Sequence, residues 1–279
     1  MKNFFLVTNK SKDPDFAVTR QIEEALLSQG GILTGKVFDN ELCGDLPEGT
    51  ECVLVLGGDG TILRTAGSLY QNDVPFLGIN AGHLGYLTEG SGSDAGRLFE
   101  KILRDEYYIE DRMLIKGMVK KSGGQKSEEI AALNDIVLGR NNSMRIIEFE
   151  LSVNGELLYT YNADGMIVST PTGSTAYNLS CGGPIVEPTA RLFLLTPIAS
   201  HSLNNRSLVL SQDDEIELKV LSSPRNEADG MEYLAYFDGD ATLPLSTGDT
   251  LAIRSEKRVV RLVRLSSRSF LETLKVKMS

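Results

Sequence analysis

The sequence lacks the features that define several protein classes. Its three cysteines, Cys43, Cys52 and Cys181, are odd in number and far apart, which excludes a disulfide framework and a zinc-ligand spacing. The formal net charge is −10, so the basic excess typical of a nucleic-acid-binding protein is missing. The densest apolar run, residues 192–199, is too short to cross a bilayer, and the apolar stretch within residues 1–8 is too short for a signal peptide. We therefore expect a cytoplasmic protein with reduced thiols that binds neither nucleic acid nor membrane.

The first 110 residues alternate between strand and helix patterns, in a 279-residue chain that is long enough for two domains. Strands are predicted at 4–8, 35–38, 52–56 and 75–80, and helices between Asp13 and Gly30, from Thr61 onward, and over 93–105. Asp13 is the expected N-cap of the first helix and Pro14 its first helical residue. The alternation predicts a Rossmann-like parallel α/β sheet, in which ligands lie beyond the carboxyl ends of the strands.

After residue 110 the pattern changes to β-structure. Strand-like runs follow one another with few helical patterns, and Asn154-Gly155 between two of them is a strong hairpin signal. We expect an all-β, sandwich-like second domain over 111–256. The closing strand RVVRLVRL and the amphipathic helix after it depart from this pattern, and they are expected to return to the first domain. The predicted domains are therefore 1–110 with 257–279, and 111–256.

The segment GGDGT directly follows the predicted strand 52–56. Its glycines let the main chain approach a phosphate, and Thr61 is expected to cap a helix whose N-terminus favours an anion. Asp59 is a candidate to accept a proton from a hydroxyl group or to help hold Mg²⁺. The segment matches neither Walker A nor G-x-G-x-x-G, and on its own it fits a plain strand-to-helix turn equally well.

Two further segments carry polar groups that suit a ligand. Asn134 and Asp135 interrupt the apolar run IAALNDIVLG, where their burial is costly unless they are hydrogen-bonded or face a cleft. A local turn is the alternative, although no glycine or proline accompanies the pair. The segment NADGMIVSTPTGSTAYNLSCGGP offers small hydroxyl donors beside Tyr177, which suits a ribose and a base. Within it, Asp164-Gly165 is ordinary turn chemistry when taken alone.

Two weaker candidates follow predicted strands. In NAGHLGYLTE, residues 80–89, His83 is a candidate ligand contact and Tyr86 a candidate stacking partner for a base, against a satisfied histidine and a packed tyrosine. FDGDA, residues 237–241, predicts a hairpin turn. With only two histidines and no G-x-S-x-G motif, the chain does not predict a serine nucleophile.

Six segments, taken together and in this order, resemble the NAD kinase family over nearly the whole chain: GGDGT, NAGHLGYLTE, the Asn134-Asp135 pair, DGMIVSTPTGSTAYNLSCGGP, SLNNRSLVL and RLVRLSSRSFLETL. The resemblance implies phosphorylation of the 2′-hydroxyl of the adenosine ribose of NAD by ATP with Mg²⁺, giving NADP. It also implies a homodimer or homotetramer that shares the NAD site between subunits. Whether ATP or polyphosphate is the phosphoryl donor is left open.

The resemblance assigns roles to individual residues. Asp59 is the implied general base, and the ATP phosphates are assigned to Gly57, Gly58, Gly60 and Thr61. NAD contacts are assigned to Asp59, Gly60, Tyr86, Asn134, Asp135, Asp164, Thr175, Ala176, Tyr177, Asn178 and Ser180. Further contacts are suggested at Arg64, His83, Arg145, Asn162, Ser174 and Asp240.

The chain departs from the family at two positions. Asp135 is commonly glutamate in the family, so its carboxylate reaches one methylene less far, and Asn162 stands where many members have arginine. Arg145 is a candidate to replace that charge. The alternative functions are a lipid kinase that shares the GGDGT loop and a non-catalytic dinucleotide sensor.

Overall fold

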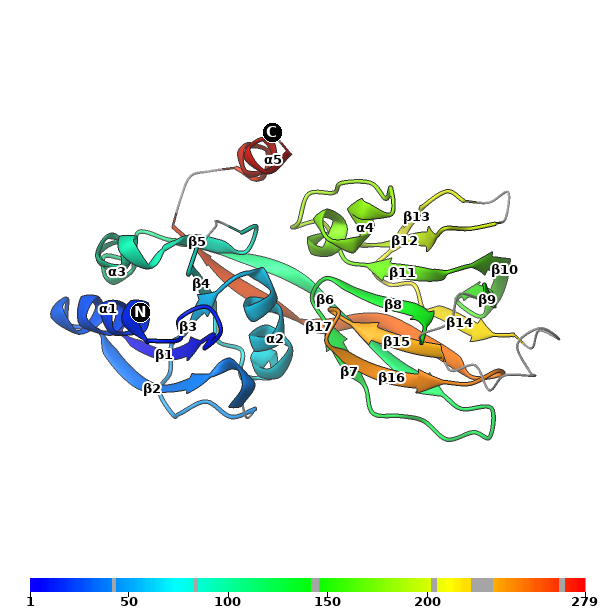
Figure 1. The fold of residues 1–279 in the computed structure, drawn as a ribbon, viewed down its shortest axis with the longest axis horizontal. Helices are drawn as coiled ribbons and strands as arrows, with labels where there is room; N and C mark the ends of the chain where they lie inside the picture. The colour runs from blue at the N-terminus through cyan, green and yellow to red at the C-terminus, as the bar shows by residue number, and fades with distance from the viewer. Residues whose placement is uncertain are drawn as a thin grey trace. The chain divides into compact units, whose positions relative to one another are not determined.

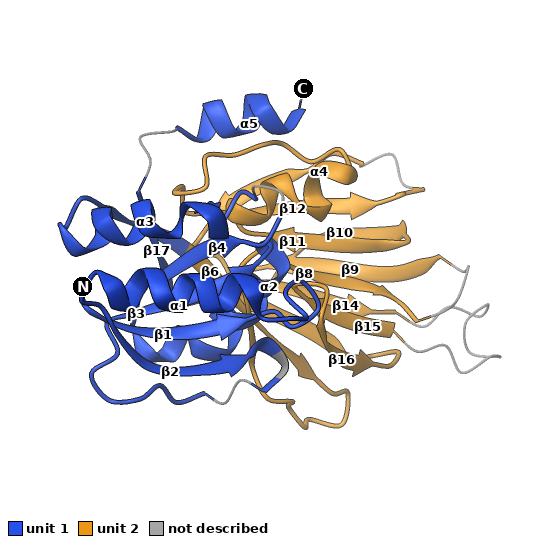
Figure 2. Ribbon diagram, turned by 60° about the vertical axis from the view of Figure 1, so that its left-hand side comes forward, with its two compact units in different colours: residues 1–112, 258–279 blue, residues 113–257 orange. Residues whose placement is uncertain are grey.

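The chain divides into two compact units. The computed structural model describes residues 1–41, 44–82, 85–141, 146–201, 205–221, 233–265 and 269–278. Unit 1 comprises Met1–Arg112 with Arg258–Ser279, and unit 2 comprises Met113–Lys257 (Figure 2). The chain passes from one unit to the other within two long strands, β6 (Tyr108–Lys120) and β17 (Thr250–Arg264).

Unit 1 contains a parallel sheet. Its strands are β1 (Asn3–Thr8), β2 (Ile32–Phe38), β3 (Cys52–Gly57), β4 (Phe76–Asn80) and β5 (Thr88–Ser91). β1 pairs with β2 and β3, β3 pairs with β4, and β4 pairs with β5, all in parallel. The end of β17 adds a further parallel partner to β4 through Leu262 and Phe76, which confirms that the closing strand returns to the first sheet.

The helices of unit 1 are α1 (Ala17–Ser28), α2 (Asp59–Leu69), α3 (Ala95–Leu103) and α5 (Phe270–Met278). α1 and α3 lie side by side (Figure 1), and their apolar faces share one core cluster with β1, β3 and β4. Short 3₁₀ turns cover Asp39–Glu41, Tyr70–Asn72 and Gly92–Asp94. None of the described helices is long and apolar enough to cross a membrane.

The predicted start of the first helix was wrong. α1 begins at Ala17, and its N-cap position is taken by Phe16 in the left-handed conformation, with φ 54°. Asp13 lies upstream of Pro14 and is only 4% exposed, and its carboxylate accepts hydrogen bonds from the N–H and the hydroxyl of Thr19 at 2.8 and 2.6 Å. Asp13 therefore accepts a hydrogen bond from a backbone N–H of the first turn of α1, as a capping residue would. It lies three residues before the N-cap position, however, and not at it.

Unit 2 is built from antiparallel strands. One sheet has the order β13-β12-β11-β8-β15-β16. Its strands are β8 (Asp135–Arg140), β11 (Gly165–Ser169), β12 (Leu192–Ile198), β13 (Leu208–Ser211), β15 (Tyr233–Phe237) and β16 (Ala241–Leu245). A second layer pairs β10 (Glu156–Ala163), β9 (Ile147–Val153), β14 (Ile216–Val220) and the first part of β17, while β7 (Ile130–Ala132) pairs with β6.

The two layers of unit 2 enclose one hydrophobic core, as expected for a sandwich. Phe149 and Leu218 from one layer and Ile136 and Phe193 from the other belong to the same buried cluster. The Asn154-Gly155 hairpin is confirmed: both residues have positive φ, and Val153 pairs with Glu156 on either side of the turn. A 3₁₀ turn (Thr172–Thr175) and the short helix α4 (Tyr177–Ser180) follow β11.

Candidate active site

Where β3 meets α2 in unit 1, side chains do not cover the main chain at Gly58 and Gly60. Gly58 is the extended N-cap of α2, with φ −101° and ψ −175° and no side-chain cap. A Cβ built on Gly58 would meet nothing within 4 Å, and one on Gly60 would meet only the end of the Arg64 side chain at 4.0 Å. An uncovered main chain at the N-terminus of an 11-residue helix favours phosphate oxygens.

Gly57 and Thr61, the first and last residues of the motif, have a packing role. A Cβ on Gly57 would lie 2.4 Å from Thr61 Oγ1, so the close approach of strand and helix requires glycine here. Thr61 is 2% exposed, and its hydroxyl accepts a hydrogen bond from Asn9 Nδ2 at 2.8 Å. The prediction that Thr61 caps α2 was wrong, because the helix begins at Asp59 and Thr61 lies inside its first turn.

Asp59 is half-buried and oriented by a second motif. Its Oδ2 accepts the N–H of Tyr86 at 2.9 Å, and its Oδ1 accepts the N–H of Leu87 at 3.0 Å. A Cβ on Gly85 would lie 2.0 Å from Asp59 Oδ1, so the carboxylate occupies space that any other residue at Gly85 would fill. GGDGT and NAGHLGYLTE, predicted separately from the sequence, thus meet at this carboxylate.

The side chain of Tyr86 lies in the same part of unit 1. Burial and the negative charge of Asp59 raise the pKa of the Tyr86 hydroxyl. Lys277 Nζ of α5 lies 5.8 Å from the centre of the Tyr86 ring, within the range of a cation–π contact. Arg64, another suggested contact, points its guanidinium at Asp39 with an ion pair of 2.9 Å. The suggested contact His83 lies outside the described residues.

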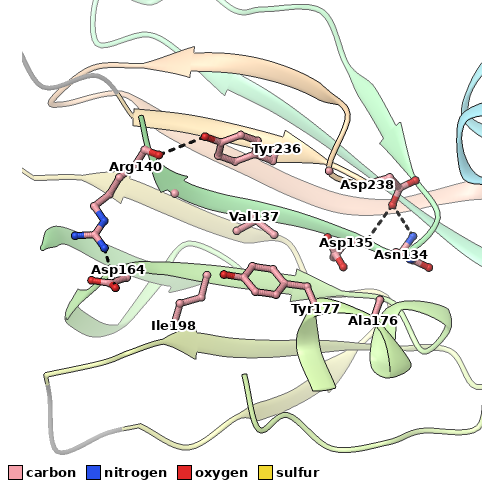
Figure 3. A pocket seen from close by; sticks show the side chains of 12 residues that line it. Asn134, Asp135, Val137, Arg140, Asp164, Ala176, Tyr177, Ile198, Tyr236 and Asp238 are labelled. Carbon is pink, nitrogen blue, oxygen red and sulfur yellow. Dashed lines mark hydrogen bonds and ion pairs between the residues drawn. The ribbon is translucent and has the colours of Figure 1, made fainter. Parts of the chain in front are cut away.

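Unit 2 contains a pocket of about 640 Å³, a size typical of small-molecule sites. The residues that line it come from β8, the β15–β16 hairpin, α4 and the ends of β10 and β12: Asn134, Asp135, Val137, Gly139, Arg140, Asp164, Ala176, Tyr177, Ile198, Tyr236, Asp238 and Gly239. In the view of Figure 3, Asp135 and the Arg140–Asp164 pair lie at opposite ends, with the Tyr177 ring between them. The pocket therefore combines an aromatic face with charged groups at both ends.

Asp238 shapes the end of the pocket that holds Asn134 and Asp135. Its Oδ1 accepts the N–H groups of Asn134 and Asp135 at 2.7 and 3.2 Å (Figure 3). Its Oδ2 accepts the N–H group of Leu133 at 2.8 Å. The predicted FDGDA hairpin is present, since Asp238 and Gly239 have positive φ between β15 and β16. The second role of Asp238 could not be predicted from the sequence, because an Asp-Gly turn gives no sign of a partner about 100 residues away.

Two carboxylates lie together at this end of the pocket. Burial and the charge of Asp238 raise the pKa of Asp135 to about 7, and Asp135 is only 6% exposed. Burial also raises the pKa of Asp238, against the lowering effect of its three backbone donors. Such a pair both accepts and donates hydrogen bonds near neutral pH, which suits the hydroxyl groups of a sugar.

At the other end, Arg140 Nη2 lies 2.8 Å from Asp164 Oδ2. Asp164-Gly165 is not a hairpin turn, because β10 and β11 belong to different sheets and the chain crosses between them here. The close packing at position 165 requires glycine, since a Cβ built there would lie 2.2 Å from the carbonyl oxygen of Leu138. Asn162 is exposed on β10 and is not a lining residue, and Arg145 lies outside the described residues.

The TGSTAYNLS segment divides into lining and supporting residues. Ala176 and Tyr177 line the pocket, and Tyr177 is 45% exposed. Ser174 and Asn178 are fully buried: the Ser174 hydroxyl bonds both backbone groups of Val186. The Asn178 amide donates to two carbonyls and accepts from Thr196 Oγ1 at 2.7 Å. These two side chains therefore hold the segment in place.

The remaining residues expected to contact NAD are exposed or half-buried. Thr175 is half-buried, while Ser180 and Asp240 are exposed. Within the described part of the chain, no group of three or more histidine, cysteine or acidic residues is arranged to hold a metal ion.

Comparison with known proteins identifies the family. The sequence model of the ATP-NAD kinase N-terminal domain matches residues 9–107, and that of the ATP-NAD kinase C-terminal domain matches residues 133–265. The NAD kinase of Lachnospira eligens is 44% identical over the whole of both chains. The NAD kinase of Agathobacter rectalis is 42% identical over 100% of this chain and 99% of that protein.

Solved structures agree in fold. The crystal structure of an NAD kinase from Archaeoglobus fulgidus in complex with ATP is 25% identical, with a TM-score of 0.79 over 99% of both chains. A yeast NADH kinase complexed with NADH has the same TM-score at 24% identity, covering 99% of this chain and 86% of that one. With two matching domain models, full-length relatives and a shared fold, this chain belongs to the NAD kinase family, whose members are enzymes that use ATP.

Proposed function

We propose that this protein transfers the γ-phosphoryl group of Mg–ATP to the 2′-hydroxyl of the adenosine ribose of NAD, giving NADP and ADP. The observation that carries the proposal is the setting of Asp59. Its carboxylate follows an uncovered glycine main chain at a helix N-terminus and is oriented by two backbone N–H groups. An oriented proton acceptor beside a phosphate-binding helix end is what phosphoryl transfer to a hydroxyl group requires.

Asp59 is proposed as the general base. The two N–H bonds leave further lone pairs on the carboxylate oxygens, and one of these accepts the proton of the 2′-hydroxyl as its oxygen attacks the γ-phosphorus in line. The bond from that phosphorus to the bridging oxygen breaks, and ADP leaves with the electron pair. The N–H groups near Gly58 and Gly60 stabilise the negative charge on the phosphoryl oxygens.

The pocket of unit 2 is proposed to bind NAD. Asn134 and Asp135 supply an amide and a carboxyl group for ribose hydroxyls, and the exposed ring of Tyr177 supplies a stacking face. Arg140 is the cation among the lining residues and faces Asp164. The remaining family assignments, including those of Tyr86, Thr175 and Ser180, stay predictions.

Mg²⁺ is proposed to enter with ATP as part of the substrate. This ion usually keeps several waters and is bound through one or two carboxylates together with substrate phosphates.

A homo-oligomer is proposed from the edge of unit 2. Among the described strands, β10 lies at the edge of its sheet, and its Leu157, Leu158 and Tyr159 are 55%, 41% and 37% exposed. Apolar side chains on an unpaired edge favour contact with a second copy of the chain. Light scattering should give a dimer or tetramer that Leu157→Lys weakens, and a monomeric wild type would exclude the assembly.

The cytoplasmic location stays a prediction, to be checked by cell fractionation.

The test incubates the purified protein with NAD, Mg²⁺ and either ATP or polyphosphate, and detects NADP with an NADP-specific dehydrogenase. Asp59→Asn should lower kcat at least about 100-fold, because general base catalysis contributes about 10²–10⁴-fold. NAD affinity should stay unchanged, and Asp73→Asn, which removes an exposed aspartate, is the matched control. A near-wild-type rate in Asp59→Asn would exclude the assigned base. Full-length NAD kinase relatives already argue against a lipid kinase or a sensor.

A further inference from the structure

We infer that Arg264, near the end of β17, is a positioning residue for the reaction, because it holds the peptide unit through which Asp59 is oriented. This inference rests on the proposed role of Asp59. Arg264 Nη2 donates to the carbonyl oxygen of Tyr86 at 3.3 Å. The same peptide unit carries the N–H of Leu87, which donates to Asp59 Oδ1 at 3.0 Å.

The peptide between Tyr86 and Leu87 thus lies between two opposite charges. A guanidinium bonds to its carbonyl oxygen, and a carboxylate bonds to its N–H group. Each interaction polarises the peptide in the direction that strengthens the other, as in a chain of hydrogen bonds. The N–H of Tyr86, on the preceding peptide, bonds to the second oxygen of Asp59 at 2.9 Å. The orientation of the carboxylate therefore depends on where this backbone segment is held.

Arg264 is itself fixed by buried partners. It is 8% exposed, its Nη1 lies 2.7 Å from Glu89 Oε1, and its Nε lies 2.9 Å from Glu110 Oε1. The second oxygen of Glu89 accepts the N–H of Leu265 at 2.9 Å, which joins the segment after Tyr86 to the end of β17 by another route. The planar guanidinium has donors in the fixed fork that two carboxylates and a carbonyl require, and a lysine ammonium does not reproduce this fork.

Arg112 provides a matched control. It is 3% exposed and pairs with the same Glu110, its Nε lying 2.9 Å from Glu110 Oε1. Arg112→Gln therefore removes a buried guanidinium from the same ion cluster while the Arg264–Tyr86 bond remains. A general loss of the cluster would affect both variants alike, whereas loss of the support for Asp59 affects only Arg264 variants.

The experiment measures kcat and both KM values for Arg264→Gln, Arg264→Lys and Arg112→Gln, with melting curves for each. Displacement of a reacting group by about 1 Å can cost about 100-fold, so Arg264→Gln should lower kcat about 10- to 100-fold with little change in either KM. Arg264→Lys should recover part of this loss, and Arg112→Gln should melt earlier but keep its kcat. Equal loss of kcat in Arg112→Gln and Arg264→Gln would overturn the inference.

A double-mutant cycle separates this inference from the proposed function. If Arg264 acts through Asp59, Arg264→Gln should cost almost nothing further in an Asp59→Asn background. If the kcat losses of the two single variants multiply in the double variant, the inference about Arg264 is wrong, while the proposed role of Asp59 stands. The same holds if Asp59→Asn is slow and Arg264→Gln is fully active. A fully active Asp59→Asn would overturn the proposed base and the inference with it. If Arg264→Gln does not fold, Arg264→Lys decides: an unchanged kcat overturns the inference, and a several-fold loss that disappears in Asp59→Asn supports it.

Discussion

Asp135→Asn should stabilise the protein and weaken its function at the same time. Asp135 is 6% exposed, and burial together with the charge of Asp238 raises its pKa from 3.8 to about 7. A carboxyl group with a higher pKa in the folded state binds more protons folded than unfolded. Its contribution to the free energy of unfolding is therefore fully present below about pH 4 and is lost as the pH rises to about 7.

The size of the effect follows from the same pKa values. A pKa difference of about 3 corresponds to about 4 kcal/mol, at about 1.4 kcal/mol per pKa unit. Part of that difference is repulsion shared with Asp238, so we expect a gain of about 1–4 kcal/mol for Asp135→Asn at pH 8. Near pH 4 the wild-type carboxyl is protonated in the folded state and only about half ionised in the unfolded state, so most of the gain should disappear.

Urea denaturation at about pH 4, 6 and 8 measures this effect. The chain has no tryptophan and nine tyrosines, so tyrosine fluorescence is the probe. Calorimetry should show NAD affinity reduced about 10- to 100-fold, because a hydrogen bond to a charged group contributes about 1.5–3 kcal/mol. A variant that is less stable than wild type at pH 8 would refute this reasoning, since the carboxylate would then stabilise the fold instead of costing free energy.

Three other substitutions test the residues that support the two sites. Asp238→Asn replaces one carboxylate oxygen by an NH₂ group and leaves at least one backbone donor of the 133–135 segment unpaired; we expect a loss of about 1–3 kcal/mol and a raised KM for NAD, measured by denaturation and kinetics. Unchanged values for both would contradict the assigned role. Gly57→Ala would push a methyl group against Thr61 and should lower stability by about 1–3 kcal/mol, whereas Gly58→Ala has open space and should fold normally with a raised KM for ATP. The reverse pattern would show that Gly58, and not Gly57, is the packing glycine.

Much of the fold could be predicted because local patterns and tertiary structure agree. β3 and β4 are buried along their whole length, and in the sequence each stands out as a short run made up mainly of apolar residues. Asn154-Gly155 supplies positive φ at both positions of a two-residue turn. The start of α1 could not be predicted, because Asp13 caps from a distance that sequence spacing does not reveal.

From the sequence, a residue of the candidate site could be predicted only where its immediate neighbours in the chain mark it. Asp59 stood out because glycines surround it, and Asn134-Asp135 because apolar residues do. Asp238 and Arg264 were missed, since each acts on a backbone segment more than 100 residues away in the sequence. For Gly57 and Gly85 the sequence showed the residue type but not its reason, which is the space taken by Thr61 and by the Asp59 carboxylate.

Because the end of β17 belongs to unit 1, unit 1 can be completed only after unit 2 has been synthesised. Unit 1 is interrupted by the whole of unit 2, so Arg264 leaves the ribosome long after Asp59 and the Tyr86 segment. Domains generally fold as units during synthesis, yet this one lacks its last parallel strand until translation is nearly finished. A chain that ends after residue 89 but before residue 264 contains the complete GGDGT and NAGHLGYLTE motifs without Arg264. Premature termination should therefore yield fragments that carry both motifs but have no kinase activity.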